Sequence, residues 1–243
     1  MEEKQLTKKE RRTLAKEIKT SEKKQQITYD RLKKLFVSVF GIFLITFIGY
    51  KIYKWIKTPE PQVAGEAVEA TENDWIKGNQ EAQVTLIEYS DFQCPACKVF
   101  SELVNELSQE FPDDLRIIYR HFPLVSNHQN AFAAGRTSEA AGKQGKFWEM
   151  HDILFEKQEE WAGEKDPQEK FLSYAKELGL NTEDFMIDYA GKETEARVNS
   201  DLLLGSRLRL NSTPTFFLNA RKISPRGYDE MKKLVEEAIS EQD

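Results

Sequence analysis

Cysteine and histidine are scarce in this sequence. Its 243 residues contain two cysteines, Cys94 and Cys97, and three histidines. A structural zinc site takes four ligands, and the spacing C-x2-C-x23-H-x6-H that begins at Cys94 matches no standard zinc finger, so no metal is expected. A disulfide between residues so close in sequence removes little entropy from the unfolded chain and would be a weak structural cross-link. These absences leave redox chemistry as the favoured hypothesis for the two thiols.

Charged residues are absent from LFVSVFGIFLITFIGY, residues 35–50. This run is shorter than the roughly 20 residues of a spanning helix, but Tyr53 and Trp55 extend it. The lysines at positions 51, 54 and 57 can reach the lipid headgroups. We therefore expect an uncleaved transmembrane anchor over 35–57, in contact with membrane lipid. A core helix would have a polar face. A signal peptide would have a shorter basic head, although cleavage after Ala64 remains the alternative.

The two signs of charge are separated along the chain. Residues 1–34 carry 12 Lys/Arg and 6 Asp/Glu, residues 35–57 add three lysines and no acid, and the remainder carries 20 Lys/Arg and 35 Asp/Glu. A basic head and an acidic body argue against a nucleic-acid-binding surface. The positive-inside rule places residues 1–34 in the cytoplasm and the body outside it, in a periplasm or cell-wall space. Disulfide chemistry is permitted in that compartment.

The periodic patterns of a folded domain begin near Asp74. Residues 58–73, TPEPQVAGEAVEATEN, are rich in Pro, Ala and Glu and are expected to form a flexible linker. From 74 to 243 the apolar periodicity predicts one α/β domain in the order β-α-β, a helical insertion over about 127–210, then β-β-α. The expected elements are strands over 82–89, 115–122, 215–219 and 222–224, and helices over 95–110 and 228–239.

The cysteine pair follows a predicted strand and opens a predicted helix. Pro95 suits the first turn of that helix, which places Cys94 at the helix N-terminus. There the unpaired N–H groups and the helix dipole stabilise a thiolate. Cys97 lies one turn further on and is expected to be more buried. Cys94 would then form mixed disulfides with a substrate, and Cys97 would resolve them.

Four strings of the chain resemble the DsbA-like branch of the thioredoxin superfamily, and more narrowly its membrane-anchored or exported bacterial members. They occur in the family's order between residues 84 and 224 and read VTLIEYSDFQCPACKVF, IIYRHFPL, KQGKFWEMHDILF and STPTFFLNARKIS. The resemblance implies an α/β thioredoxin fold with an inserted helical subdomain, here preceded by one transmembrane helix.

The resemblance also implies roles for residues around the cysteine pair. Pro214 would have a cis peptide bond and face the cysteines, and Thr213 would offer backbone hydrogen bonds to an extended substrate segment. Glu88 would be a buried carboxylate that shuttles protons for the resolving cysteine, the alternative being an ordinary, partly exposed strand residue. The dipeptide Pro95-Ala96 departs from the Pro-His pair of the best-known oxidases, which bears on how oxidising the site is.

The activity implied by the resemblance is thiol–disulfide exchange on exported client proteins, with oxidation as the favoured direction. A quinone-linked membrane partner of the DsbB or vitamin K epoxide reductase type would then reoxidise the pair, and no organic cofactor is implied. Two alternatives stay open. The same site could act as a reductase or isomerase, or the domain could be a tethered binding module with an inert disulfide. Isomerases of this group usually add a dimerisation domain, for which residues 58–73 are too short.

Overall fold

The computed structural model describes residues 33, 36, 40, 41, 43–51, 65 and 67–242. The chain divides into two units, residues 1–60 and 61–243. In the first unit, residues 43–51 are helical and expose large apolar side chains. Within the described residues, no helix combines the length and the apolar character needed to cross a membrane. Most of the predicted basic segment, 1–34, and part of the predicted anchor, 35–57, lie outside the described residues.

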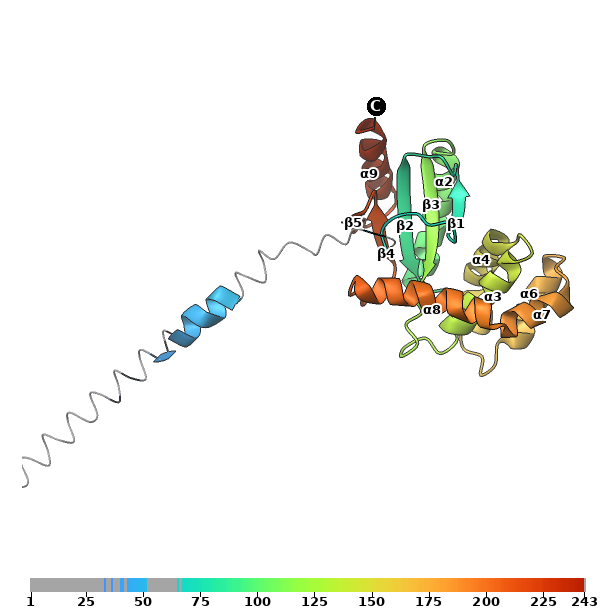
Figure 1. Ribbon diagram of the computed structural model, residues 1–243, viewed down its shortest axis with the longest axis horizontal. Coiled ribbons are helices and arrows are strands. Elements are labelled where there is room, and N and C mark those ends of the chain that lie inside the picture. Colours follow the sequence, from blue (N-terminus) through green and yellow to red (C-terminus); the bar gives the residue numbers. More distant parts are fainter. Residues whose placement is uncertain are drawn as a thin grey trace, which may run out of the picture. The chain divides into compact units, whose positions relative to one another are not determined.

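A five-stranded mixed sheet lies in the second unit (Figure 1). Its strands are β1 (Trp75–Gly78), β2 (Val84–Ser90), β3 (Leu115–His121), β4 (Thr215–Leu218) and β5 (Arg221–Ile223), in the spatial order β1-β3-β2-β4-β5. β2 and β3 run parallel, which requires the crossover between them, and the other neighbours are antiparallel. β2 is buried along its whole length because helices cover both of its faces.

The edge strand β1 was not expected from the sequence. Its four residues are too few for a periodic pattern, and they are only partly buried because β1 pairs with β3 alone. Trp75 of this strand stacks on Phe147, with 4.7 Å between ring centroids, and its indole N–H donates to Glu139 at 2.8 Å. The same Glu139 oxygen lies 2.8 Å from Nε2 of His121. β1 therefore joins the sheet to the helical insertion.

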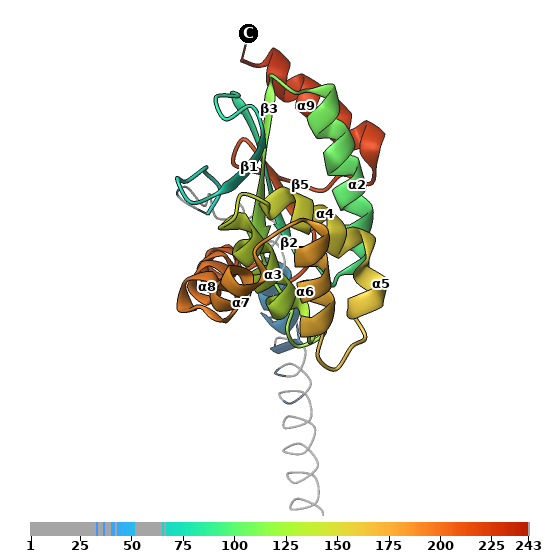
Figure 2. The same cartoon turned by 90° about the vertical axis from the view of Figure 1, so that its right-hand side faces the viewer.

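Different helices cover the two faces of the sheet (Figure 2), and each face has its own core. The helices α2 (Pro95–Glu110) and α9 (Tyr228–Ser240) cover one face. Side chains alternate along a strand, so Leu86 faces these helices, where it packs in one cluster with Val104 and Val235. Ile87 points to the opposite face and packs with Leu202 of α8. Glu88 and Ser90, two and four residues after Leu86, share the α2 face.

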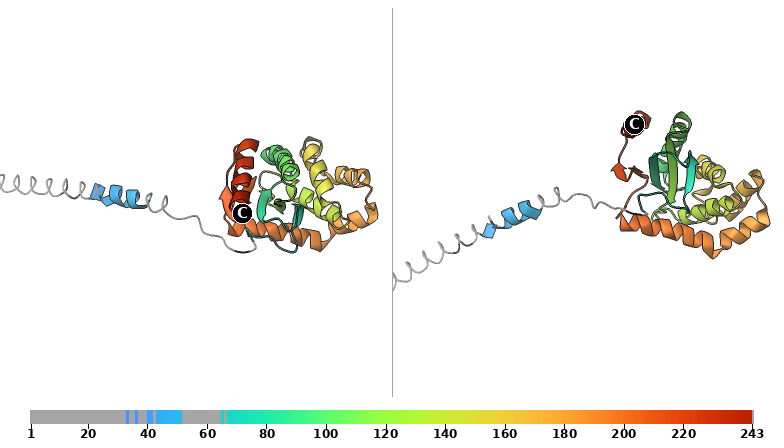
Figure 3. Two further views of the ribbon diagram at one scale, coloured as in Figure 1. Left: turned by 90° about the horizontal axis from the view of Figure 1, so that it is seen from above. Right: turned by 45° about the horizontal axis from the view of Figure 1, so that its top comes forward.

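The helical insertion lies between β3 and β4, and its core extends to Tyr119 of β3 and to the cysteine pair. It consists of α3 (Ala131–Gly142), α4 (Phe147–Glu156), α5 (Gln158–Trp161), α6 (Gln168–Glu177), α7 (Thr182–Ala190) and α8 (Lys192–Arg207). Trp161, Phe171 and Phe185 are buried together in this core. Figure 3 shows α8 running from the other helices of the insertion back along the sheet.

Residues 67–74, which we name the N-terminal segment, pack on the sheet. Ala67 and Val68 are buried in the apolar cluster on the α8 side. The hydroxyl of Tyr89 donates to the Ala67 carbonyl at 2.7 Å. The predicted flexible linker, 58–73, therefore does not extend through residues 67–73, because these small apolar side chains fill a place in the core.

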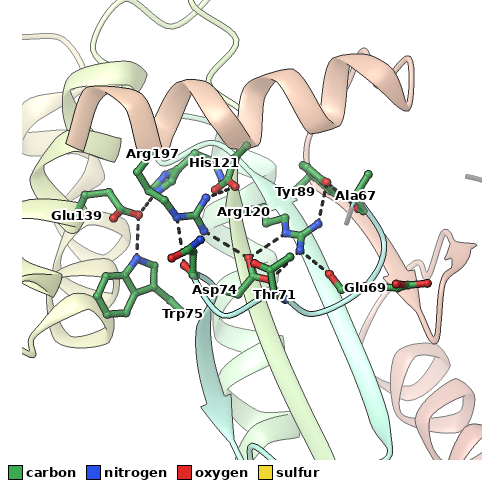
Figure 4. A network of polar contacts seen from close by, with 12 residues as sticks. Ala67, Glu69, Thr71, Asp74, Trp75, Tyr89, Arg120, His121, Glu139 and Arg197 are labelled. Atoms are coloured by element: carbon green, nitrogen blue, oxygen red, sulfur yellow. Dashed lines mark hydrogen bonds and ion pairs between the residues drawn. The ribbon is translucent and has the colours of Figure 1, made fainter. Parts of the chain in front are cut away.

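A buried arginine holds the N-terminal segment to the sheet (Figure 4). The Arg120 guanidinium, on β3, donates to the two carboxylate oxygens of Asp74 at 3.1 and 2.7 Å and to the Glu69 carbonyl at 2.6 Å. Both charged side chains are almost fully buried. Arg197 of α8 reaches the same carboxylate at 3.4 Å and also pairs with the buried Asp201. This network joins the segment, the sheet and the insertion.

Candidate active site

Cys94 caps the start of α2. Its backbone is extended, with φ −77° and ψ 123°, and Pro95 follows in the first turn, where the missing N–H is not needed. Asp91 shapes the turn that leads out of β2. Its carbonyl accepts from the Cys94 N–H at 3.0 Å, and its Oδ1 accepts from the Gln93 N–H at 2.7 Å. The Cys94 sulfur therefore lies at the end of the helix where backbone N–H groups are free.

The two thiols are not joined in a disulfide, and their surroundings differ. Cys94 is 8% exposed and Cys97 is 0% exposed. Hydrogen bonding from the Cys97 thiol lowers the pKa of Cys94 to about 5; burial opposes the shift, while the N–H groups of Cys97 and Ala96 add to it. Burial raises the pKa of Cys97 well above its ordinary value. At neutral pH, Cys94 is therefore the thiolate and Cys97 the thiol.

The loop before β4 faces the cysteine pair. The Thr213–Pro214 peptide bond is cis, and the Thr213 carbonyl lies 3.5 Å from the Cys94 sulfur. β4 pairs with β2, the strand that leads to Cys94, which explains how residues 119 positions apart come together. Thr213 and Pro214 are half-buried, while Pro95 and Ala96 are exposed. These four residues border the surface from which a client would reach Cys94.

Glu88 is buried in β2 on the same side of the sheet as α2. It is 2% exposed, so it is not the partly exposed strand residue of the alternative interpretation. Its Oε1 has no hydrogen-bond partner among the described residues. Burial raises the pKa of Glu88 to about 7. A carboxyl group with that pKa can both give and accept a proton near neutral pH.

The helical insertion holds the backbone of the active-site turn. Gln158 of α5 is buried, and its Nε2 donates to the carbonyls of Phe92 at 2.7 Å and Cys94 at 3.1 Å. The Gln93 side chain accepts from the Asn130 N–H at 2.7 Å. The sequence gives no sign of this role for Gln158, because an amide 64 residues from Cys94 in a helical stretch resembles any surface residue.

Each of the three histidines lies beside a carboxylate. Nδ1 of His128 lies 2.8 Å from the Asp91 carboxylate, and His121 and His151 have partners in Glu139 and Asp152 at the same distance. Across the part of the chain that the structure describes, there is no cluster of three or more His, Cys, Asp or Glu suited to a metal ion.

The thiolate of Cys94 gives a prediction for the reduced protein. We expect the absorbance of the thiolate to titrate with a midpoint near pH 5 and to be missing from the Cys94→Ala variant. Since the pKa is lower in the folded than in the unfolded protein, the thiolate stabilises the folded, reduced form. This stabilisation is complete above the ordinary pKa of 9.0 and is lost as the pH falls through about 5.

Thermal denaturation of the reduced and the oxidised protein measures this effect. The stability of the reduced form relative to the oxidised form should rise between about pH 5 and about pH 9, in line with the linkage between folding and proton binding. A thiolate midpoint above about pH 8, near that of a free cysteine, would contradict the prediction.

Comparisons with known proteins concern mainly the second unit. The family model described as thioredoxin matches residues 70–237. Among curated proteins, the chain is 36% identical over 186 residues to the Na(+)/H(+) antiporter NhaA 1 of Mycolicibacterium gilvum (strain PYR-GCK), covering 74% of this chain and 29% of that protein. It is 35% identical over 184 residues to the Na(+)/H(+) antiporter NhaA of Herminiimonas arsenicoxydans, covering 73% and 28%. The chain thus spans less than a third of the length of these relatives.

Solved structures share the arrangement of sheet and inserted helices. BdbD from Bacillus subtilis, in its oxidised form, has a TM-score of 0.61 at 26% identity, over 68% of this chain and 92% of that one. A thioredoxin-like oxidoreductase from Silicibacter pomeroyi DSS-3 gives 0.62 at 26% identity, over 73% and 99%. The α-DsbA1 protein of Wolbachia pipientis gives 0.65 at 19% identity, over 72% and 96%, which bears on the fold alone.

Proposed function

The chain belongs to the thioredoxin family, in its DsbA-like branch as the sequence resemblance predicted, and on this basis we propose that it introduces disulfides into exported proteins through Cys94 and Cys97. Thiol–disulfide exchange in general is supported by the family and by the likeness, at 26% identity, to BdbD and to the thioredoxin-like oxidoreductase. The direction of exchange and the location of the domain are the parts that we propose.

The difference between the two thiols carries the proposal. Cys94 is stabilised as a thiolate at the start of α2, while Cys97 is fully buried and has a raised pKa. Only a sulfur that borders the surface can form a mixed disulfide with a protein client, and Cys94 is that sulfur. An inert disulfide in a binding module would need neither a stabilised thiolate nor a protonated neighbour.

The proposed oxidation takes place in two exchanges. A client thiolate attacks the sulfur of Cys94, the bond between Cys94 and Cys97 breaks, and Cys97 leaves with the electron pair and takes up a proton. The second client thiolate then attacks the client sulfur of the mixed disulfide, and Cys94 leaves as a thiolate. The client loses two electrons and the cysteine pair gains them. The half-buried Thr213 lies where its backbone could pair with an extended client segment.

The low pKa of Cys94 favours this direction. A thiolate with a pKa of about 5 is a good leaving group in the second exchange. It also stabilises the reduced form, which makes the disulfide more oxidising. No histidine lies between the cysteines, because position 96 is alanine. The Cys97 thiol and the backbone N–H groups of Cys97 and Ala96 stabilise the thiolate instead.

The reduction potential tests the direction of exchange. Equilibration with glutathione buffers should give a value closer to roughly −120 mV than to roughly −270 mV. An oxidised protein mixed with one equivalent of a dithiol peptide should also oxidise it in a single turnover, and Cys94→Ala should not. A potential near that of thioredoxin would support the reductase alternative instead, and oxidation by Cys94→Ala would contradict the enzymatic proposal altogether.

We place the catalytic domain outside the cytoplasm, with residues 35–57 as its membrane anchor. The separation of basic and acidic residues supports this, as do the exposed apolar side chains of the helical residues 43–51, among them Phe43, Ile45 and Phe47. A quinone-linked membrane partner would reoxidise the pair. Protease added to intact cells from which the outer membrane or cell wall has been removed should digest the domain. Full protection of the domain would contradict this location.

A further inference from the structure

Two backbone carbonyls of the active-site turn accept hydrogen bonds from one side chain of the insertion. Nε2 of Gln158, on α5, donates to the Phe92 carbonyl at 2.7 Å and to the Cys94 carbonyl at 3.1 Å. Gln158 is 5% exposed, so both bonds are made away from water. An amide nitrogen suits this place because it carries two hydrogens, one for each carbonyl, and brings no charge into the interior.

The other backbone groups of this turn have partners near them in the chain. The Asp91 carbonyl accepts from the Cys94 N–H at 3.0 Å, and Oδ1 of Asp91 accepts from the Gln93 N–H at 2.7 Å. The Cys94 carbonyl also accepts from the Lys98 N–H at 3.2 Å, which begins the bonding pattern of α2. Gln158 therefore supplies a second donor, from a distant element, to the carbonyl of the residue whose sulfur reacts.

The insertion keeps Gln158 in place beside the turn. Trp161 of the same helix is fully buried, and its indole N–H donates to a carbonyl of α4 at 2.9 Å. Asn130 donates to the Trp161 carbonyl at 3.1 Å. The Gln93 side chain donates to the Ala162 carbonyl at 2.8 Å. Since α5 is fixed both to the core of the insertion and to the turn, the Gln158 amide is already in position before any client arrives.

On the proposed function, we infer that Gln158 is a positioning residue whose amide holds the Cys94 sulfur against the free N–H groups at the start of α2, which makes the disulfide more oxidising. The Cys94 carbonyl carries a partial negative charge close to that sulfur, and the Gln158 donor offsets part of it. The same bond restrains the Cys94 backbone, on which the approach of the sulfur to the N–H groups depends. Both effects favour the thiolate, and a stabilised thiolate favours the reduced form.

The hydrogen bonds of Gln158 can be removed without changing a charge. The charged side chains on either side of it in the chain face other partners, since Lys157 pairs with Glu177 and Glu159 pairs with Lys98. The Gln158 amide is neutral and acts through the Cys94 backbone, not on the sulfur itself. A neutral substitution at this position therefore tests the two hydrogen bonds alone.

Gln158→Met should make Cys94 a weaker acid and the cysteine pair less oxidising. Methionine suits a buried position and is similar in length to glutamine, but it has no hydrogen to donate. The midpoint of the Cys94 thiolate absorbance should rise from about pH 5 to about pH 6, a tenfold loss of acidity. The equilibrium with glutathione at pH 7 should shift about tenfold towards the oxidised protein, which lowers the reduction potential by about 30 mV.

Two further variants separate this role from a loss of stability. Gln144→Met removes another amide of the insertion, one that bonds the N–H and the carbonyl of Asn181 at 2.9 and 3.1 Å, and both quantities should stay within about twofold of the native values. Gln158→Asn keeps an amide but is one methylene shorter, so it should shift both quantities in the same direction as Gln158→Met. Thermal denaturation of the full chain establishes that each variant is folded.

The midpoint and the potential should change together. A change in acidity of less than about twofold in both Gln158 variants would overturn the inference, as would a shift of equal size in Gln144→Met. A raised midpoint with an unchanged potential would contradict it as well. If the native protein has a potential near that of thioredoxin, the proposed direction of exchange fails, while the shift between native and variant protein still decides the role of Gln158.

Discussion

Replacing Cys97 by alanine should leave a client covalently attached to Cys94. The test uses a peptide whose single cysteine carries a coloured thiol leaving group. In the reduced native protein, the Cys94 thiolate attacks the peptide sulfur, and Cys97 then attacks Cys94, forms the internal disulfide and releases the peptide. Without Cys97 the second step is lost. The native resolving thiol is already in place, so the mixed disulfide of the variant should last at least about 1,000-fold longer.

Mass spectrometry of the intact protein measures this result. Cys97→Ala should gain the mass of one peptide for each coloured thiol released, and the native protein should release the coloured thiol without retaining peptide. Cys94→Ala should do neither, because Cys97 is buried. A native protein that retains the peptide as long as Cys97→Ala would refute the resolving role, and the same trapping in cells would identify the clients.

Replacing Asp74 by asparagine should strongly destabilise the domain. The change keeps the shape of the side chain but removes the charge that Arg120 meets at 2.7 Å in a fully buried position. Breaking a buried pair in this way costs about 3–5 kcal/mol, because the remaining charge cannot reach water. For a domain of this size, that corresponds to a fall of about 10 °C in Tm.

Thermal and urea denaturation check this loss against a matched control. The Glu159 side chain is 91% exposed and pairs with Lys98. Glu159→Gln breaks this surface ion pair and should change the free energy of unfolding by less than about 1 kcal/mol. If Asp74→Asn costs no more than Glu159→Gln, the N-terminal segment does not depend on the buried pair. Replacing both Asp74 and Arg120 with apolar residues should recover part of the loss.

The central strands and the cysteine site could be predicted from the sequence because their signals are local. β2 is a mostly apolar run rich in β-branched residues, and the proline after Cys94 marks a helix start, with only residues 91–94 between the strand and the helix. The position of Thr213 could be predicted only through the family resemblance, since 119 residues separate it from Cys94. The sequence left two alternatives for Glu88, a buried carboxylate and a partly exposed strand residue, and its 2% exposure decides for the first.

What escaped prediction depends on contacts between distant segments. β1 is four residues long and becomes a strand only because β3 offers it a free edge. The N-terminal segment resembles a linker in composition, and the side chains that hold it, among them those of Tyr89, Arg120 and Arg197, lie more than 20 residues further along. Gln158 acts on the active-site turn from the insertion, and its sequence neighbours carry no trace of that contact.

The attachment of the N-terminal segment also determines where a mechanical load would enter the domain. A pull on the chain before residue 65 reaches Ala67 and Glu69 before any strand, and there it meets the hydroxyl of Tyr89 and the guanidinium of Arg120. These side chains come from β2 and β3, the two central strands, so tension spreads into the middle of the sheet instead of peeling away its edge. On the proposed anchoring, a domain that is held by one end while it is bound to a client would therefore bear the tension through these two strands.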